Sequence, residues 1–437
     1  MARESRITHS RLGRLAKLGG LATSVAGNVL LQGSKSLISG NRPVLSDLVL
    51  SPGNARKVSK KLSEMRGAAM KVGQLLSMDV GYLLPAEVSE IFANLRNDAH
   101  QMPMLEVNQQ MTGALGDNWQ QHFKRFHFQP VASASIGQVH LAEMQNGQMV
   151  AVKLQYPGVK ESIDSDIDNI AMLLDFLKLI PADLDIQPLI EDARLQLHAE
   201  ADYRQEAEFI TEFARFLSND DRFELARVEQ QLSSESVLTT DFLGGDVIDT
   251  CKFESYQTRQ HVSEALLELA LKEVFHFGLV QTDSNFANYL FDKNSHKIQL
   301  LDFGASRHYD ADTQKHLSGL LIASMENDEE AILTSAQEIG YTSTDDEQSY
   351  QDMIVDLIQT VTLPLRHQGR FDFSSSQLSQ LMMDKLVKLR FEQRYTRLPP
   401  ADILFLHRKL GGLYLLLAHL GAKIDVAEIV NDRIQST

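Results

Sequence analysis

The spacing of apolar residues divides the chain into a helical beginning, a short β-rich stretch and a long, mostly helical remainder. Apolar positions recur every three or four residues over about 1–50 and again over 55–79, which predicts two amphipathic helical segments. Between 126 and 156 the period becomes two, which predicts a strand–loop–strand–turn–strand unit. Its turn is Asn146-Gly147, a dipeptide in which both residues tolerate positive φ and therefore favour a tight hairpin.

After this unit, long helical patterns alternate with short apolar runs. The pattern predicts helices over 170–179, 193–217 and 262–277, and short strands over 237–242 and 298–301. The last third of the chain reads as helical almost to its end. The simplest arrangement of these elements is a small β-containing lobe followed by a larger helical lobe, which is an α+β fold.

Charge is distributed unevenly along the 437 residues. The whole chain has a formal charge of −16, which argues against nucleic acid as a partner because nucleic-acid binding needs a cationic surface. The first 61 residues nevertheless hold eleven cationic and two acidic residues, a net charge of +9. This asymmetry predicts a basic arm with a surface partner of its own, and an anionic membrane is one candidate. The alternative is a helix that packs on the rest of the protein.

The cysteine count and the lengths of the apolar runs bear on disulfide bonds and on membrane-spanning segments. The single cysteine, Cys251, rules out an internal disulfide and fits a reducing compartment, and we expect it to be a buried apolar filler. The longest late apolar run, 410–422, is shorter than the ~20 residues that cross a bilayer. We therefore expect no integral membrane segment there.

Two short motifs in the second half carry the strongest chemical signal. Asp283 and Asn288 lie five residues apart in Q-T-D-S-N-F-A-N, and Asp302 follows in L-L-D-F-G. Phosphoryl transfer needs a carboxylate near the attacking oxygen and separate oxygen ligands for magnesium, and protein kinases take them from an Asp-x-x-x-x-Asn loop and an Asp-Phe-Gly turn. Either motif alone occurs by chance, but both together at this interval indicate nucleotide chemistry.

A lysine on an apolar strand is the second signal. In V-A-V-K, alternation places Lys153 on the face opposite to the valines, where its ammonium needs an anion such as a nucleotide phosphate or a glutamate. The alternative is a lysine that reaches solvent at a strand end. The loop before this strand, 132–138, reads A-S-A-S-I-G-Q and has one glycine, so we expect a stiffer phosphate loop than that of ordinary kinases.

Together these motifs resemble the UbiB/AarF family of atypical kinase-like proteins, in its coenzyme Q (ubiquinone) branch. Lys71, Gly73 and Gln74 match its K-x-G-Q motif, residues 132–138 match its alanine-rich loop, and Glu200-Ala201-Asp202 matches its E-x-D motif. The resemblance runs from about Ser5 to Gly412. It implies a two-lobed protein-kinase-like fold with an N-terminal helical extension.

The resemblance also implies a division into four segments. These are a basic amphipathic arm over 1–50, a helical extension with the K-x-G-Q motif over 51–120, a kinase-like N-lobe with inserted helices over 121–245, and a helical C-lobe over 246–437.

The family's functional residues can be placed on matching positions. Lys153 would contact ATP phosphates, with Glu206 as its ion-pair partner and Glu200 as the second candidate. Asp283 would be the catalytic carboxylate, and Asn288 and Asp302 the Mg²⁺ ligands. The other expected nucleotide contacts are Ala132, Ser133, Ala134 and Ser135 in the alanine-rich loop, and Asp241 and Leu243 in the adenine hinge. The expected cover over the substrate entrance consists of Lys71, Gly73 and Gln74, helped by Glu200 and Asp202.

The function implied is that of an ATP-binding atypical kinase or ATPase that supports ubiquinone biosynthesis, by Mg²⁺-dependent hydrolysis of ATP or by phosphoryl transfer to a small molecule or lipid. The alternatives are a protein serine/threonine kinase and a nucleotide-responsive scaffold without catalysis. Expected partners are ATP or ADP, an anionic membrane surface, and ubiquinone-biosynthesis proteins or their lipid intermediates. A homodimer is left open, as is the nucleotide preference, because Ser133 replaces an alanine of the family loop. We expect a cytoplasmic location, peripheral on the inner membrane face.

Overall fold

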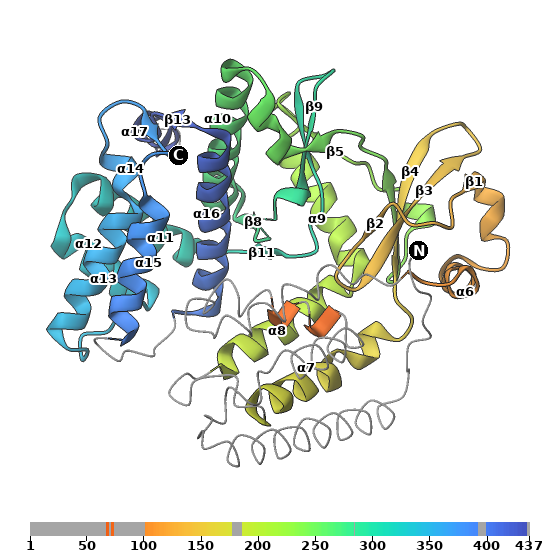
Figure 1. Ribbon diagram of the computed structural model, residues 1–437, viewed down its shortest axis with the longest axis horizontal. Coiled ribbons are helices and arrows are strands. Elements are labelled where there is room, and N and C mark those ends of the chain that lie inside the picture. Colours follow the sequence, from red (N-terminus) through yellow and green to blue (C-terminus); the bar gives the residue numbers. More distant parts are fainter. Residues whose placement is uncertain are drawn as a thin grey trace, which may run out of the picture. The chain divides into compact units, whose positions relative to one another are not determined.

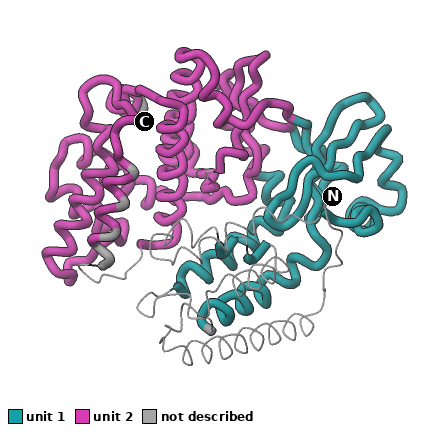
Figure 2. Tube along the Cα trace, in the orientation of Figure 1, with its two compact units in different colours: residues 1–208, 227–242 teal, residues 209–226, 243–437 magenta. Residues whose placement is uncertain are grey.

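The computed structural model describes residues 67–69, 71–73, 101–176, 186–283, 285–391 and 399–434. The predicted basic arm, most of the helical extension and Gln74 lie outside these residues. The described chain forms two compact units (Figure 2). One holds the described residues up to Glu208 together with Arg227–Phe242, and the other holds Phe209–Ala226 and the residues from Leu243 onward. The limits of the four predicted segments stay predictions.

A five-stranded antiparallel sheet forms the centre of the first unit (Figure 1). Its strands are β1 (Phe123–Phe126), β2 (Ala132–Ser133), β3 (Gly137–Met144), β4 (Met149–Gln155) and β6 (Val237–Asp241). The order is β1-β3-β4-β6, and β2 pairs with β3. The alternating apolar pattern thus forms the predicted hairpin strands, and alternate residues of β4 (Val150, Val152, Leu154) are buried.

The β3–β4 hairpin differs from expectation in the backbone of its turn. Gly147 has a φ of 88°, but Asn146 is not among the residues with positive φ. The Asn146 side chain instead accepts a hydrogen bond from the backbone N–H of Gln148 at 2.9 Å. An asparagine that bonds to the backbone two residues later already stabilises the turn, so a single left-handed residue suffices.

One face of this sheet is covered by α6 (Met104–Leu115) and the short helix η3 (Trp119–His122). Met111 and Trp119 pack there against Val152 of β4, and all three side chains are at most 1% exposed. Trp119 also meets the ring of Phe126 edge-on, with centroids 5.0 Å apart. Burying each such side chain stabilises the fold by about 2 kcal/mol. The covered face is therefore the hydrophobic core of the first unit.

Three helices follow β4 along the chain: α7 (Val159–Phe176), α8 (Gln187–Glu200) and α9 (Tyr203–Phe216). The prediction of one continuous helix over 193–217 is wrong, because the chain breaks at Ala201-Asp202. Asp202 Oδ1 accepts hydrogen bonds from the backbone N–H groups of Arg204 (3.0 Å) and Gln205 (3.4 Å). An aspartate whose side chain bonds to the first backbone N–H groups of a helix starts a new helix at that point.

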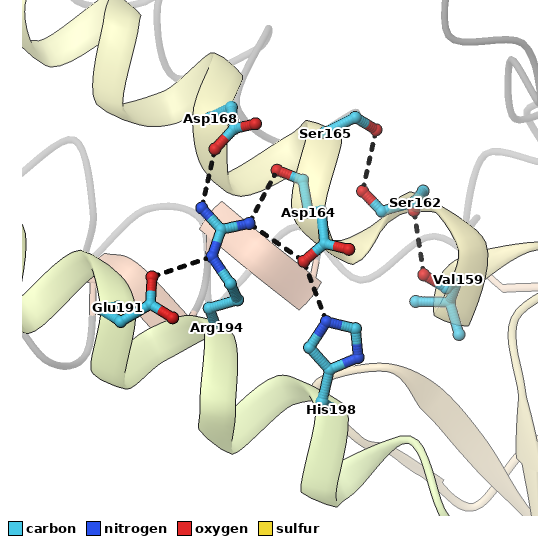
Figure 3. Close-up of polar contacts among 8 residues, drawn as sticks. All are labelled: Val159, Ser162, Asp164, Ser165, Asp168, Glu191, Arg194 and His198. Atoms are coloured by element: carbon cyan, nitrogen blue, oxygen red, sulfur yellow. Dashed lines mark hydrogen bonds and ion pairs between the residues drawn. The ribbon is translucent and has the colours of Figure 1, made fainter.

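Helices α7 and α8 pack side by side and are joined by Arg194 (Figure 3). Its guanidinium contacts Asp164 of α7 at 3.0 Å and Asp168 of α7 at 2.7 Å, while His198 of α8 contacts Asp164 at 2.9 Å. Hydrogen bonds from His198 and Arg194 lower the pKa of Asp164. These contacts hold α7 and α8 together, although the segment that connects the two helices lies partly outside the described residues.

The second unit contains three small sheets. The largest has the order β5-β10-β9-β7, formed by β5 (Phe223–Leu225), β10 (Lys297–Leu300), β9 (Tyr289–Asp292) and β7 (Asp246–Val247). The others pair β8 (Leu279–Gln281) with β11 (Ser306–His308), and β12 (Phe371–Asp372) with β13 (Lys423–Ile424). The short strands predicted near 237–242 and 298–301 are confirmed as β6 and β10, each within a residue or two at its ends.

Helices make up most of the second unit. The predicted helix 262–277 is confirmed as α10 (Tyr256–Lys272), and its continuation Glu273–Phe277 (η6) is a π-helix that ends at left-handed Gly278. The later α-helices are α11 (Ala311–Glu326), α12 (Glu329–Ile339), α13 (Gln348–Val361), α14 (Leu363–Arg366), α15 (Leu378–Phe391), α16 (Ala401–Leu420) and α17 (Val426–Ile434). Besides η3, the described 3-10 turns are η4 (Gln230–Leu232) in the first unit, and η5 (Ile248–Phe253) and η7 (Phe286–Asn288) in the second.

Helix α16 packs against α10 and η5. Among the helices described, it is the one whose length and composition would suffice to cross a membrane, and 56% of its most apolar window is buried in the protein. Burial of this extent is typical of the core helix of a globular unit. Cys251 on η5 is also buried, as expected, and burial raises the pKa of its thiol to about 12. A thiol with so high a pKa is not a nucleophile at neutral pH.

A carboxylate with three cationic hydrogen-bond contacts, whose side chain is 13% exposed, yields the first prediction. Asp220 accepts two hydrogen bonds from Arg222, each 2.8 Å long, and one from Lys272 of α10 at 2.7 Å. Hydrogen bonding to Arg222 lowers the pKa of Asp220 well below its ordinary value. Its stabilising contribution is therefore present above about pH 4 and is lost as pH falls further. We expect Asp220→Asn to lower the free energy of unfolding by about 2 kcal/mol at pH 7.

The measurement is denaturant unfolding at pH 7 and pH 3. The difference between the wild-type protein and Asp220→Asn should shrink at the lower pH, and exposed Asp345→Asn should change stability little at either pH. An Asp220→Asn effect equal at both pH values would contradict the assignment.

Candidate nucleotide site

Lys153 and Glu206 form an ion pair on the face of the first unit's sheet opposite to the face that α6 and η3 cover. The Lys153 Nζ atom lies 2.8 Å from Glu206 Oε1 and 2.9 Å from Oε2. The Lys153 side chain is 16% exposed and that of Glu206 is 3% exposed. Alternation along β4 directs Val152 and Leu154 into the core and Lys153 to the other face, where α9 supplies Glu206 in its first turn. The ion pair implied by the family resemblance is present.

An aromatic ring and a glycine define the surroundings of this pair. Lys153 Nζ lies 5.2 Å from the ring centroid of Tyr203, which is fully buried at the start of α9. A Cβ atom on Gly137 would lie 2.3 Å from the Leu154 carbonyl oxygen and 2.9 Å from the Tyr203 hydroxyl. The single glycine of the alanine-rich loop is therefore needed for close packing of β3 against β4 and α9.

The alanine-rich loop is held close to β3. Ala132 pairs with Val139 and Ser133 with Gln138, and the backbone N–H of Ala134 donates to the Gly137 carbonyl at 2.9 Å. Ala132 and Ser133 are exposed. Because Ala132 and Ser133 are small and exposed, they leave room for a ligand next to β3. The backbone hydrogen bonds to β3 limit the movement of the loop.

Lys71 of the K-x-G-Q motif forms an ion pair with Glu200, the glutamate of the E-x-D motif. Ser135 of the alanine-rich loop donates to the other carboxylate oxygen of Glu200 at 2.6 Å. A Cβ on Gly67 would lie 2.7 Å from the Ile136 side chain. The described part of the early helix, which includes Gly73, therefore packs directly on the alanine-rich loop, and Glu200 joins the two.

Two predicted site residues have structural contacts of their own. Asp202 starts α9, as described above. The Asp241 carboxylate accepts hydrogen bonds from Gln148 and from the backbone N–H of Arg227 (3.2 Å), so its side chain is turned towards these neighbours. A nucleotide contact at Asp241 would then use the backbone. Leu243, the other predicted hinge residue, begins a stretch of the second unit.

The second unit brings Asp283 and Asn288 together. Asn288 Nδ2 donates to the backbone oxygen and to Oδ2 of Asp283, both at 3.2 Å. Asn285 caps the short η7 turn through Ala287 N at 3.1 Å, which places Asn288 at the end of that turn. The Asn288 carbonyl then accepts from the backbone N–H of Leu301 at 2.8 Å. The amide NH₂ group of Asn288 therefore faces Asp283.

Asp302 follows β10 in a strained conformation. Its φ is 52°, in the left-handed region that non-glycine residues rarely adopt. Its Oδ1 accepts from Gly304 N at 3.3 Å, and its backbone oxygen accepts from Gln281 Nε2 at 3.1 Å. The adjacent Phe303 is 3% exposed and packs on Phe213 with centroids 4.8 Å apart. Strain of this kind concentrates at functional sites and persists where neighbouring contacts hold it in place.

The donor set suits magnesium. Carboxylate and amide oxygens are the ligands that Mg²⁺ takes from proteins, with phosphates and water completing its coordination. Asp302 and Asn288 supply one oxygen of each kind. No group of three or more His, Cys, Asp or Glu side chains suited to a metal occurs among the residues described.

Several residues of the site region were missed by sequence reasoning. Tyr203 lies beside Lys153, and Gln281 contacts Asp302. Gln281 in turn contacts Tyr289 and Lys409, which belongs to the H-R-K-L-G-G stretch of α16. The available signal was a lysine inside an apolar helix, the same reasoning that identified Lys153.

A sheet lysine paired with a helix glutamate, an Asp-x-x-x-x-Asn loop and a strained Asp-Phe-Gly turn together define a kinase-like phosphotransferase. Comparison with known families agrees. Residues 94–336 match the family model of the ABC1 atypical kinase-like domain. The chain belongs to this family, and the resemblance to atypical kinase-like proteins is confirmed.

Individual relatives cover nearly the whole chain. The mitochondrial atypical kinase COQ8 of Saccharomyces cerevisiae is 36% identical over 98% of this chain and 86% of its own length. The mitochondrial atypical kinase COQ8B of Rattus norvegicus is 33% identical over 99% of this chain and 82% of its own length. A probable serine/threonine-protein kinase, abkA of Dictyostelium discoideum, is 31% identical over 98% of this chain and 79% of its own length.

A solved structure has the same fold. Rv3197 of Mycobacterium tuberculosis, in complex with erythromycin, superposes with a TM-score of 0.62 at 24% identity, over 87% of this chain and 95% of its own. The α+β, kinase-like fold class with a β-sheet N-lobe and a helical region is thereby confirmed.

The Lys71–Glu200 pair yields the second prediction. The Lys71 side chain is 4% exposed, so Lys71→Met would leave the Glu200 carboxylate without its cation. Breaking a buried ion pair costs about 3 kcal/mol, and we expect the local stability of the early helix to fall by that order. Hydrogen exchange at the backbone amides of residues 67–69 and 71–73 measures this loss. The matched control is Lys124→Met, which breaks a Lys–Glu pair whose lysine is 59% exposed. Equal effects of the two variants would contradict the prediction.

Proposed function

We propose that this protein is a magnesium-dependent atypical kinase or ATPase whose site comprises Lys153, Glu206, Asp283, Asn288 and Asp302. The observation that carries the proposal is the Lys153–Glu206 ion pair. A buried glutamate fixes a sheet lysine at the position that kinases use to hold nucleotide phosphates. The kinase-like fold implies that the nucleotide is ATP.

Each half of the site has a distinct role. Lys153 binds the phosphates, and Glu206 keeps its side chain extended. Asn288 and Asp302 hold Mg²⁺, which neutralises charge on the phosphates when it is bound. Asp283 accepts the proton of the attacking hydroxyl or water, and the hydrogen bond from Asn288 Nδ2 orients its carboxylate. The alanine-rich loop, Ala132 to Ser135, would contact the phosphates, and Asp241 and Leu243 would contact the adenine.

The early helix limits what can be phosphorylated. Lys71, Gly73 and Gln74, together with Glu200 and Asp202, would cover the entrance that a protein substrate uses in other kinases. The contacts of Lys71 with Glu200, and of Glu200 with Ser135, support such a cover, because they join the helix to the phosphate loop. Hydrolysis of ATP or phosphorylation of a small molecule or lipid is therefore favoured over phosphorylation of a protein.

The biological setting is a proposal of the same kind. Resemblance to the coenzyme Q branch supports a role in ubiquinone biosynthesis, with lipid intermediates or enzymes of that route as partners. The yeast and rat relatives are named as mitochondrial proteins, which does not favour a plain cytoplasmic location. Peripheral contact with an anionic membrane would use the basic segment of the first 61 residues.

The third prediction separates metal binding from turnover. Asp302→Asn should weaken magnesium-dependent ATP binding at least 10-fold, because an amide replaces the charged metal ligand. Asp283→Asn should retain nucleotide binding and lose at least 100-fold in phosphate release, because it removes the proton acceptor. Calorimetric titration of ATP with and without Mg²⁺ measures binding, and phosphate release is followed with and without anionic vesicles.

The control is Asp312→Asn on α11, an exposed carboxylate in a helical first turn, which should leave both quantities unchanged. Absence of nucleotide binding by the wild-type protein would overturn the proposed function. Equal loss of ATP affinity in Asp283→Asn and Asp302→Asn would overturn the separate roles.

The two alternatives make different predictions in the same variants. A scaffold that responds to nucleotide without catalysis would support growth of a strain lacking the native protein when it carries Asp283→Asn, but not Asp302→Asn. A protein serine/threonine kinase, as the name of abkA suggests for that relative, would transfer phosphate to protein. Weakening the cover with Lys71→Met should raise phosphorylation of protein only if a docking site lies beneath it.

A further inference from the structure

The second unit contains a buried ion pair between Lys409 and Glu273. Hydrogen bonds connect it to the loop that carries Asp302 and Phe303, called the metal loop below. Lys409 Nζ of α16 is 2.8 Å from Glu273 Oε2 and 3.1 Å from Oε1, and the two side chains are 5% and 2% exposed. Burial disfavours the ammonium, but the neighbouring carboxylate outweighs this and raises the pKa of Lys409. Burial also raises the pKa of Glu273, and the Lys409 ammonium opposes that rise. Glu273 is the first residue of the π-helical turn that follows α10, and such turns occur often at functional sites.

The pair is connected to further buried groups. Lys409 Nζ also lies 3.1 Å from the Tyr289 hydroxyl and 3.5 Å from Gln281 Oε1. The Tyr289 hydroxyl donates to the same Gln281 oxygen at 3.1 Å. The backbone N–H of Gln281 donates to Glu273. Gln281 is thus held by three partners: its side-chain oxygen by Lys409 and Tyr289, and its backbone N–H by Glu273.

The free end of Gln281 reaches the metal loop. Its Nε2 atom donates to the backbone oxygen of Asp302 at 3.1 Å. Asp302 has a φ of 52°, a conformation that must be held by its neighbours. A glutamine whose oxygen is fixed by Lys409 and Tyr289 presents its NH₂ group in one orientation, and that group holds the Asp302 carbonyl.

The burial of two charges needs a reason other than stability. A buried ion pair commonly stabilises a protein no more than apolar residues of the same size. Here the pair and its partners Gln281 and Tyr289 are all less than 9% exposed, and their hydrogen bonds lead to one backbone oxygen of a strained residue. Outer-shell groups that orient metal ligands have this arrangement.

We propose that Glu273, Lys409 and Gln281 form a positioning network that sets the Asp302 carboxylate for metal binding. Gln281 is the member that contacts Asp302, and the ion pair acts through Gln281. The inference rests on the proposed role of Asp302 as a magnesium ligand. These are positioning residues, since none of them contacts the nucleotide or the metal in this assignment.

The central variant is Gln281→Met, which keeps the length of the side chain and leaves Lys409 with Glu273 and Tyr289. The matched control is Gln260→Met. Gln260 is also a buried glutamine of the second unit that bonds to backbone groups, donating to the Gly421 carbonyl at 3.3 Å and accepting from Lys423 N at 2.8 Å. Both variants lose backbone hydrogen bonds of the same kind, but only the first loses the bond to Asp302.

Two readouts apply. Without nucleotide, the backbone amides of residues 303–305 should exchange hydrogen at least 10-fold faster in Gln281→Met than in Gln260→Met. With nucleotide, the Mg²⁺ concentration that half-saturates ADP binding should rise about 10-fold in Gln281→Met, the lower end for loss of an outer-shell partner. Affinity for ADP without metal should stay within twofold of the wild-type value.

The ion pair is tested by Lys409→Met combined with Glu273→Gln, which removes both charges together and leaves neither unpaired. We expect a smaller loss of Mg²⁺ affinity than in Gln281→Met, because Tyr289 still holds Gln281. Adding Gln281→Met to this double variant should cause no loss beyond that of Gln281→Met alone, since residues acting through one group are not additive. The single variant Lys409→Arg, which keeps the positive charge, should retain most of the wild-type Mg²⁺ affinity.

Gln281→Met indistinguishable from Gln260→Met in both readouts would overturn the network. Additive losses would overturn the claim that the ion pair acts through Gln281. A wild-type protein that binds no nucleotide would overturn the proposed function instead, and the exchange measurement without nucleotide would still decide whether Gln281 holds the metal loop.

Discussion

A buried ammonium group needs a carboxylate, and this requirement organises both units. Lys71 meets Glu200, Lys153 meets Glu206 and Lys409 meets Glu273, and five of these six side chains are no more than 13% exposed. Each pair joins elements far apart in the sequence: the early helix to α8, β4 to α9, and α16 to the turn after α10. Because an unpaired charge in the interior is costly, each pair restricts the approach of its two elements to one geometry.

The three pairs differ in what they hold in place. Lys153 is the most exposed of the three lysines, at 16%, and both carboxylate oxygens of Glu206 accept hydrogen bonds from it. Lys71 is almost fully buried and attaches the early helix to the phosphate loop through Glu200 and Ser135. Lys409 is buried among side chains that lead to Asp302. One kind of interaction therefore joins the elements that carry the residues proposed for ligand binding, for the cover and for metal binding.

Local patterns predicted much of the fold and of the candidate site. Period-two alternation identified β3 and β4, and the same alternation showed that Lys153 leaves the apolar face. The break at Ala201-Asp202 was missed because helical periodicity continues on both sides of it, and only the hydrogen bonds of Asp202 reveal that it begins a second helix. Gln281 and Lys409 were missed for a different reason. They lie 128 residues apart, and no local pattern reports such a contact.

By itself, the sequence predicted the β3–β4 hairpin, the short strands β6 and β10, the kinase-like class indicated by the Asp-x-x-x-x-Asn and Asp-Phe-Gly motifs, and the need of Lys153 for an anion. These follow from side-chain spacing and charge, which act over a few residues. Only the tertiary structure decided which carboxylate meets each buried lysine, that Asp241 turns its side chain towards Arg227, and that Gln281 holds the strained Asp302. Those outcomes depend on the packing of distant segments, because desolvated charges accept whichever partner the folded chain brings within reach.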